Sequence, residues 1–466
     1  MKAHGQSGFC GKILNPINEE KENLEKRIVI PCRPDYGLLE KTYRKNELIA
    51  IFDKQPTSEE INERKKYLFD RYGIENIKIM QCGCCCDLRV QLWLADDIHT
   101  VISGNPVTGG SGGSDHTVGD NYSLNFLSKI PTPKKVKPNK HPGDPHNPQI
   151  KLQEDLITIA VLDTGVDLDF VDNNYIGKNL LNKTGDPCFK DSLSGWNFVD
   201  NTPDTNDDND HLHGTLVTQY IIDQFEDLSE KEVKNELQII PLKTHNKDGV
   251  GDLFAIYCAV HYAIAKGANI INASWGFYYY EDENTGAIKL LCKLIEESKE
   301  NGILFVTAAG NETGEDDIAK EIYKVQHGNY PNSIILRDLD FNPFIPACLS
   351  AERDNMITVT TTDDQRVAPT ENFSKEYVDL GVNYKAHSGQ DFEFAIPFFE
   401  TGTIDYISGS SFATAIASGV IGANCDKARY VRNTINRTSF INDLKAKGLC
   451  KENVTLKAKI KDGNYI

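Results

Sequence analysis

The sequence predicts an α/β domain built on a mostly parallel sheet, with a small α+β domain before it. Two continuous apolar runs, Ile157 to Leu162 and Ile303 to Val306, are typical of strands buried on both faces. Between them Asp252 has the position of an N-cap, followed by a helix with apolar residues on one face. These elements lie within residues 151–430, a stretch long enough for one large α/β core.

The small domain is predicted over residues 46–97. Leu48 to Phe52 has the composition of a strand, and the helix after it begins at a capping box formed by Thr57 and Glu60. Two more strands are expected at residues 77–80 and 88–94, on either side of a cysteine-rich turn.

The composition of the remaining residues indicates a linker, a C-terminal tail and an unassigned N-terminal segment. Residues 98–150 are rich in glycine and proline and predict a flexible linker. Residues 431–466 form a C-terminal tail with one expected helix, and residues 1–45 are left unassigned.

The charge balance argues against nucleic acid as a partner. The chain has 466 residues and a net charge of −18, with no basic stripe. No run is long and apolar enough to span a membrane, so no membrane partner is expected. The N-terminus lacks the apolar core of a signal peptide, which favours a cytoplasmic protein.

The twelve cysteines fit a reducing compartment. Cys258 and Cys292 fall in expected helices and are interpreted as buried thiols. A cluster of four thiols in the N-terminal domain could bind a soft metal, but no second pair follows at metal-binding spacing. A structural or redox-sensitive hairpin is therefore favoured for this cluster, which comprises Cys82, Cys84, Cys85 and Cys86.

Four polar residues, each in a distinctive local setting, carry the candidate chemistry. Asp163 ends a buried strand, His213 precedes Gly-Thr and a helix, and Ser411 opens a helix of small residues. A serine hydroxyl needs a base to take its proton, and the base needs a carboxylate to hold its other nitrogen. Asn311 follows the second buried strand, where its amide could donate to an oxyanion together with the Ser411 backbone N–H.

Two neighbours compete for these roles. His211 lies close to His213 but lacks the Gly-Thr that follows it, so it is interpreted as a loop residue. Ser410 is adjacent to Ser411 and is the rival nucleophile.

The order Asp, His, Asn, Ser and the motifs around these residues resemble those of the subtilisin-like serine proteases. The resemblance implies a three-layer α/β fold and a serine endopeptidase that cleaves peptides or proteins. It implies a triad of Asp163, His213 and Ser411, with Asn311 in the oxyanion hole. The chain departs from the family pattern at Leu216, Phe412 and Ala415, none of which removes a proton-transfer group.

The resemblance also outlines a substrate groove. One wall is expected at Gly249, Gly251 and Leu253, where the backbone would pair with substrate as an added strand. The opposite wall is expected at Ser274, Trp275 and Gly276. The aromatic segment that follows, residues 277–280, is either a further substrate wall or a loop packed on the core.

The N-terminal domain resembles the first part of a subtilase propeptide, which implies a zymogen bound by its own pro-region and cut within the linker. An unrelated accessory domain is the alternative. Two other functions stay open, a catalytically silent scaffold that binds extended peptides and an activator protease that keeps its N-terminal domain as a sensor or docking module.

No cofactor is expected to be required. An acidic loop before His213 carries hard oxygen ligands that could hold Ca²⁺, but its spacing does not match an EF-hand. A solvated acidic loop is the alternative for the residues concerned, Asp200, Asp204, Asp207 and Asp208.

Overall fold

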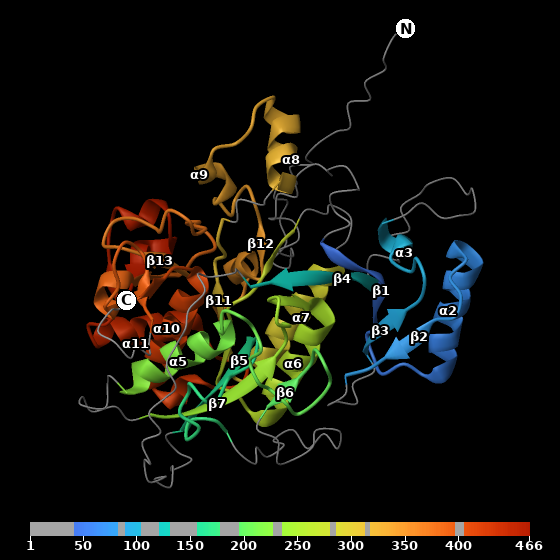
Figure 1. Cartoon of the computed structure of the whole chain (residues 1–466), viewed down its shortest axis with the longest axis horizontal. Coiled ribbons are helices and arrows are strands. Elements are labelled where there is room, and N and C mark those ends of the chain that lie inside the picture. The colour runs from blue at the N-terminus through green and yellow to red at the C-terminus, as the bar shows by residue number, and fades with distance from the viewer. Residues whose placement is uncertain are drawn as a thin grey trace.

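A computed structural model gives the fold of the chain, as a large domain and a smaller one beside it (Figure 1). It describes residues 42–82, 89–103, 121–130, 156–177, 195–226, 235–279, 286–312, 317–396 and 405–466. Within these ranges no helix is long and apolar enough to cross a membrane.

A nine-stranded sheet forms the centre of the large domain. Its strand order is β17-β18-β14-β13-β11-β9-β5-β7-β6, and all neighbours are parallel except β17 and β18. The strands are β5 (Leu156–Asp163), β6 (Trp196–Asn197), β7 (Glu236–Lys243), β9 (Ile270–Ala273), β11 (Leu304–Ala308), β13 (Met356–Thr362), β14 (Leu380–Asn383), β17 (Lys451–Glu452) and β18 (Asn464–Tyr465).

Helices cover both faces of this sheet, because the central strands are apolar on both sides. Along β5, Ile157, Ile159 and Val161 join a core with helices α5 (His213–Glu226) and α10 (Ser410–Asn424). The alternate residues Ala160 and Leu162 join a second core with α6 (Leu253–Lys266) and α7 (Gly286–Glu300). This two-residue alternation is that of a strand buried between two helical layers. The predicted three-layer α/β fold is confirmed.

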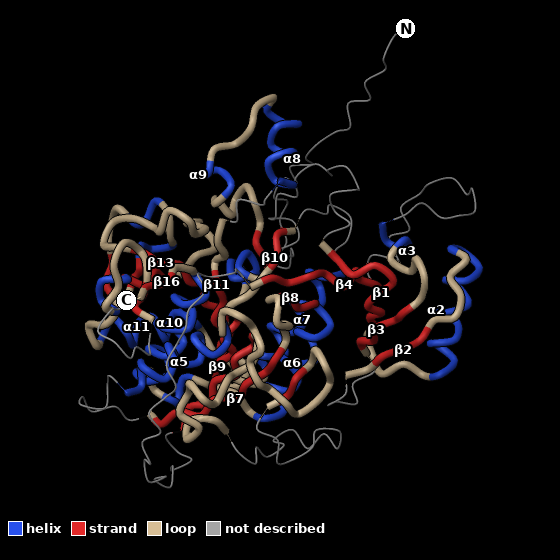
Figure 2. The backbone as a smooth tube through the Cα atoms, viewed as in Figure 1, coloured by secondary structure: helices blue, strands red, loops and turns tan. Residues whose placement is uncertain are grey.

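Smaller elements surround this core (Figure 2). The tail after residue 430 contributes β17 and β18 to the large sheet, so it is part of this domain. The other elements are β8 (Val250–Asp252), β10 (Phe277–Tyr278), β12 (Phe344–Ile345), β15 (Phe394–Ala395), β16 (Tyr406–Ile407), α8 (Asp317–His327), α9 (Ser333–Leu336) and α11 (Arg437–Ala446).

The small domain has the order β-α-β-β-α-β, which completes the pattern that the sequence showed only in part. The capping box of Thr57 and Glu60 begins its first helix, as predicted. The final helix and strand lie inside the predicted linker 98–150, so this domain extends further along the chain than its composition indicated. Its elements are β1 (Tyr43–Ile51), α2 (Ser58–Tyr72), β2 (Lys78–Met80), β3 (Val90–Leu94), α3 (Thr100–Ser103) and β4 (Tyr122–Lys129).

The sheet of the small domain continues into the large domain. Its order is β2-β3-β1-β4-β8, and β8 belongs to the large domain. On one face, Leu48 and Trp93 pack with α2 and α3 in a core of their own. On the other face, residues such as Ile49 and Phe126 share a core with α6 and α7. The two domains are therefore packed together through an apolar interface and a shared sheet.

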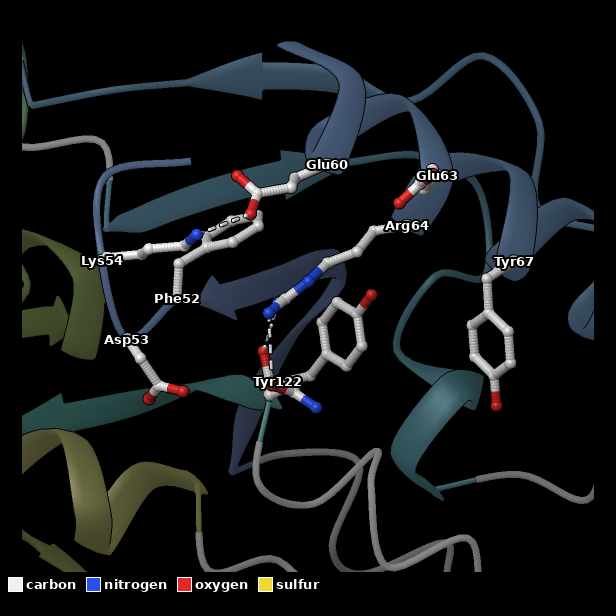
Figure 3. Close-up of a pocket in the computed structure, with 9 residues that line it drawn as sticks. Phe52, Asp53, Lys54, Glu60, Glu63, Arg64, Tyr67 and Tyr122 are labelled. Atoms are coloured by element: carbon white, nitrogen blue, oxygen red, sulfur yellow. Dashed lines mark hydrogen bonds and ion pairs between the residues drawn. The ribbon is translucent and has the colours of Figure 1, made fainter. Parts of the chain in front are cut away.

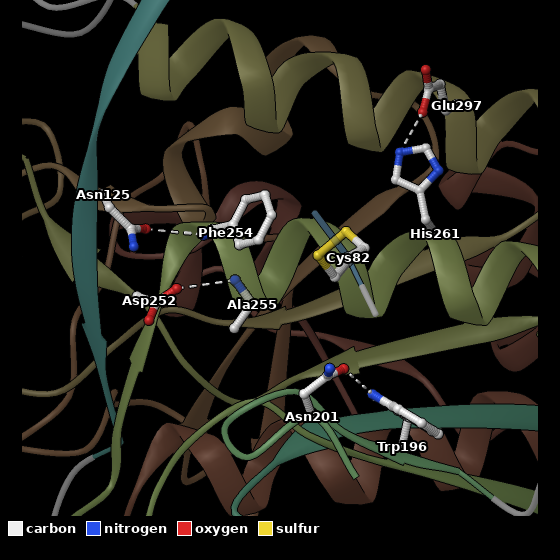
Figure 4. Close-up of a disulfide and its surroundings, with 10 residues drawn as sticks. Cys82, Asn125, Trp196, Asn201, Asp252, Phe254, Ala255, His261 and Glu297 are labelled. Atoms are coloured by element: carbon white, nitrogen blue, oxygen red, sulfur yellow. Dashed lines mark hydrogen bonds and ion pairs between the residues drawn. A yellow bond between two sulfur atoms is a disulfide. The ribbon is translucent and has the colours of Figure 1, made fainter. Parts of the chain in front are cut away.

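A disulfide between Cys82 and Cys258 joins the two domains (Figure 4). The prediction that Cys258 is a buried thiol is therefore wrong. Cys292 is half-buried on α7. The other cysteines of the N-terminal cluster, Cys84, Cys85 and Cys86, lie outside the described residues.

Candidate active site

Asp163 and His213 meet at the carboxyl end of β5. Asp163 is the last residue of that strand and His213 is the first residue of α5. The Nδ1–H group of His213 donates to Asp163 Oδ1 over 2.8 Å, and both side chains are 1% exposed. The backbone N–H of Thr164 donates to the same carboxylate oxygen, and the Thr164 hydroxyl accepts from Gly214 N–H. These bonds fix the orientation of the imidazole and the start of the helix.

Gly214 is required by the close approach of α5 to the end of β5. A Cβ atom at this position would lie 2.3 Å from the Gly165 carbonyl oxygen and 3.1 Å from Asp163 Cβ. Real Cβ atoms do not approach backbone this closely, so a side chain here would push the helix away from the strand.

Replacing Gly214 with alanine is therefore expected to lower activity and to destabilise the protein by about 1–3 kcal/mol. The midpoint of urea unfolding and the hydrolysis rate measure the two effects. An alanine variant that matches the wild type in both would contradict the close packing described here.

Ser411 lies in the first turn of α10, and its hydroxyl is bound to the end of β9. Ser411 Oγ donates to the Ser274 carbonyl oxygen over 3.0 Å, and Ser274 Oγ donates to the Ser411 carbonyl oxygen over 2.9 Å. His213 Nε2 is buried and has no hydrogen-bond partner. The His213 ring lies 5.2 Å from the ring of Phe412, the neighbour of Ser411. The serine–histidine hydrogen bond is thus not made in this state.

The Asn311 side chain is held by Ser410, the residue next to Ser411. Asn311 Oδ1 accepts from the Ser410 backbone N–H at 3.0 Å and from the Ser410 hydroxyl at 2.9 Å. With the oxygen engaged in this way, the amide nitrogen is turned away from Ser410. A Cβ at Gly409 would lie 3.4 Å from that nitrogen, and Gly409 has φ 143°, a backbone conformation that favours glycine.

The two neighbours that compete with the triad residues have other contacts. Asp163 is bonded to His213, and the backbone N–H of His211 donates instead to Asn209. Ser410 Oγ accepts from Gly310 N–H and donates to Asn311, so this hydroxyl is committed to positioning the asparagine.

The predicted groove is occupied by the end of β4 from the small domain. Ser128 lies opposite Gly251 in an antiparallel pairing with β8. Lys129 N–H donates to the Gly276 carbonyl oxygen at 3.1 Å, and Ile130 N–H donates to the Gly249 carbonyl oxygen at 2.9 Å. An extended strand thus lies between the two walls predicted from the sequence. The resemblance implied that a pro-region binds to the catalytic domain, but β4 lies in the stretch predicted to be a linker, so this strand was not predicted.

The walls contribute backbone groups rather than exposed side chains. With β4 in place, the side chains of Leu253 and Trp275 are 0% and 1% exposed and belong to the core. Phe277 stacks on Phe126 of β4, with ring centroids 5.4 Å apart. This aromatic residue therefore contacts the small domain.

A buried histidine that sequence analysis missed lies under the bound strand. His245 Nε2 is 3.0 Å from Ser128 Oγ, and its Nδ1 is 2.9 Å from Thr244 Oγ1. Desolvation lowers the pKa of His245 to about 4, so the ring is neutral at physiological pH. A neutral ring can donate from one nitrogen and accept at the other, which matches these two hydroxyl contacts.

The acidic loop suggested for Ca²⁺ directs its carboxylates to different partners. Asp207 is buried and accepts from the backbone N–H and hydroxyl of Thr215, and burial raises its pKa. Asp208 is paired with Lys243. Asp200 accepts from Asn197, and Asp204 accepts from a backbone N–H. Among the described residues no group of three His, Cys, Asp or Glu side chains is placed to hold a metal ion. Calcium binding stays a prediction.

A pocket of about 450 Å³ lies away from these residues, in the small domain (Figure 3). The Arg64 guanidinium crosses it, 3.8 Å from the centroid of the Phe52 ring, and donates to the carbonyl oxygen of Ile51. Lys54 is paired with Glu60 at the mouth. Arg64 is therefore bound to the backbone and Lys54 to Glu60.

Comparisons with known proteins identify the family of this chain. The family model described as "Subtilase family" (Peptidase_S8) matches residues 154–447, more than half of the chain. The chain belongs to the subtilase family. Subtilisin-like protease 1 of Plasmodium berghei (strain Anka) is 30% identical over 210 residues, which cover 43% of this subtilase and 32% of the relative. The minor extracellular protease Epr of Bacillus subtilis (strain 168) is 26% identical over 197 residues, which cover 42% of this subtilase and 26% of Epr.

These curated relatives are longer proteins, and this subtilase spans about a third of their length or less. Among solved structures, a serine-to-alanine mutant of the epidermin leader peptide processing serine protease (EpiP) from Staphylococcus aureus matches with a TM-score of 0.50. That match has 17% identity and covers 91% of this chain and 97% of EpiP. At this identity it shows the shared fold.

Proposed function

We propose that this subtilase is a serine endopeptidase that hydrolyses peptide bonds through an acyl-enzyme on Ser411. The observation that carries the proposal is the state of the His213 imidazole. Its Nδ1 is anchored on a buried carboxylate, while its Nε2 is buried, unpartnered and beside the first turn of α10. An imidazole held in this tautomer is suited to accept a proton from a nearby hydroxyl.

In the proposed reaction Ser411 Oγ leaves the Ser274 carbonyl and attacks the substrate carbonyl carbon. Its proton passes to His213 Nε2, and Asp163 stabilises the imidazolium that forms. The oxyanion accepts hydrogen bonds from the Asn311 amide and the Ser411 backbone N–H. His213 then gives its proton to the leaving amine, and water repeats the sequence to release the acyl group.

The strand bound in the groove supports two parts of the proposal, that the substrate is a peptide and that the protein is made as a zymogen. Lys129 and Ile130 make the main-chain hydrogen bonds that an extended peptide makes when it adds to a sheet. Lys129 pairs with Gly276, which lies two residues after the Ser274 carbonyl that holds the Ser411 hydroxyl. Because this pairing is antiparallel, β4 runs in the direction that leads from Gly276 toward Ser274. The N-terminal domain would therefore block the groove until the chain is cut just beyond it.

We predict that the wild type cuts its own chain after Ile130 and before residue 150, inside the predicted window of 98–149. A tethered strand has a high effective concentration, so even a poor sequence is cleaved. Mass measurement of purified protein under reducing, denaturing conditions tests this prediction. The wild type should give two fragments and Ser411→Ala one intact chain.

An uncut wild type that still hydrolyses peptides would contradict the proposal that the protein is a zymogen. It would still agree with the proposed peptidase activity. A wild type that neither cuts itself nor hydrolyses peptides would favour the alternative, a silent scaffold that binds extended peptides in the same groove.

A further inference from the structure

The Cys82–Cys258 disulfide links the two domains across the proposed cleavage site. Cys82 follows β2 in the small domain, and Cys258 is the sixth residue of α6 in the large domain. The two cysteines are 176 residues apart, and both are buried, at 6% and 2% exposure. A cut after Ile130 and before residue 150 places them on different fragments. Cleavage alone would then leave the fragments covalently joined.

Non-covalent contacts at the interface surround the disulfide. Glu297 of α7 is 3.4 Å from Arg89 of the small domain and 3.3 Å from His261, one turn along α6 from Cys258 (Figure 4). Arg44 is paired with Asp252 at 2.9 Å, and Asn125 accepts from the Phe254 backbone N–H at 3.0 Å. These contacts hold the small domain, with β4 in the groove, against the large domain. Without a covalent link, however, a cleaved domain held by them would dissociate on dilution.

A disulfide between the domains prevents this dissociation. It keeps the cleaved domain at an effective concentration in the millimolar range, whatever the protein concentration. The strand that fills the groove would therefore return to it after each opening. The tether turns a removable pro-region into a retained subunit of the mature protein.

We propose that the Cys82–Cys258 disulfide retains the N-terminal domain on the catalytic domain after cleavage, and that an external dithiol releases it. A thiolate of the dithiol attacks one sulfur and forms a mixed disulfide, and the other cysteine leaves as a thiolate. The second thiol of the reductant then attacks the reductant's own sulfur in the mixed disulfide, and the remaining protein cysteine leaves as a thiolate. The products are free Cys82, free Cys258 and the oxidised dithiol, with two electrons transferred. The activation step rests on the proposed function, whereas the covalent linkage does not.

Both sulfurs are buried, so the dithiol reaches them only when the small domain lifts locally from α6. We therefore expect slow reduction in the resting protein. A disulfide that persists in this way is typical of oxidising compartments, which does not fit the expected cytoplasmic location.

The linkage can be tested without any activity of the protein. A recognition site for a sequence-specific protease is placed between residues 135 and 145 of full-length Ser411→Ala, and the chain is cut there. We expect the fragments to migrate together on a denaturing gel without reductant and to separate with dithiothreitol. Peptide mapping without reductant should recover a peptide pair that contains Cys82 and Cys258.

Cys82→Ser and Cys258→Ser should each let the fragments separate without reductant. Cys348→Ser, at a buried cysteine that forms no disulfide, is the matched control and should keep them joined. Fragments of the parent that separate in denaturant without reductant would overturn the proposal. So would fragments that stay joined in Cys258→Ser.

The activation step is tested with self-cut wild type at nanomolar concentration. Dithiothreitol should raise peptide hydrolysis by about tenfold or more, because the released domain no longer rebinds. Cys258→Ser should be active at that dilution without reductant, and Cys348→Ser should still need it. If the disulfide linkage is found but no variant hydrolyses peptides, the proposed peptidase activity is wrong and the proposed covalent linkage is still correct. Full hydrolysis by the unreduced, linked wild type would overturn the release step.

Discussion

Replacing Ser411 with alanine is expected to abolish peptide hydrolysis, and replacing His213 with alanine should do so to the same extent. The serine supplies the electron pair and the histidine takes the proton, so neither can work without the other. The loss should be about 10⁶-fold in kcat for either change, and the double variant should be little worse than each single variant. Steady-state hydrolysis of a peptide library measures all three, with each variant cut at the engineered site between residues 135 and 145 and then reduced. The fold should be unchanged in circular dichroism.

Ser418→Ala is the matched control for this experiment. Ser418 lies on the same helix as Ser411 and is also buried, but its hydroxyl donates to Asn272. This variant should lose some stability and keep most of its turnover. Near-wild-type turnover in Ser411→Ala would show that the nucleophile has been misassigned.

The second large effect is expected at Asn311. Asn311→Ala should lower kcat by about 10²–10³ with little change in KM, because the amide donates chiefly once negative charge develops on the substrate oxygen. The alanine also removes the acceptor for the Ser410 N–H and hydroxyl. A second variant is needed to separate these two effects.

Asn311→Asp keeps an acceptor oxygen for Ser410 and removes the donor. It should be at least as inactive as the alanine variant, because a second carboxylate oxygen would face the oxyanion. An aspartate variant with wild-type kcat, or an alanine variant in which only KM rises, would assign Asn311 a structural or substrate-binding role instead.

The parts of the fold that sequence analysis predicted are those with local signals. The apolar run before Asp163 indicated a buried parallel strand, and the structure has β5 there with helices on both faces. The capping box at Thr57 and the N-cap at Asp252 both form as expected. Each of these features depends on residues close together in the chain.

The features that sequence analysis missed depend on distant pairings. β4 lies in a stretch with the composition of a linker, and one of its two strand partners, β8, is more than a hundred residues away. Cys258 has the surroundings of an ordinary helical thiol, and no local pattern shows that Cys82 lies against it. Disulfide connectivity in general does not follow from cysteine spacing.

Covalent labelling with a fluorophosphonate, followed by peptide mapping, shows whether Ser411 is the activated nucleophile. The wild type should first cut itself, and the two variants should be cut at the engineered site between residues 135 and 145. All three are then reduced, so that the groove is open in each. We predict one adduct on the peptide that contains Ser411, and no adduct in Ser411→Ala or His213→Ala. Labelling of a different serine, or a reduced wild type that hydrolyses peptides without reacting at Ser411, would contradict it.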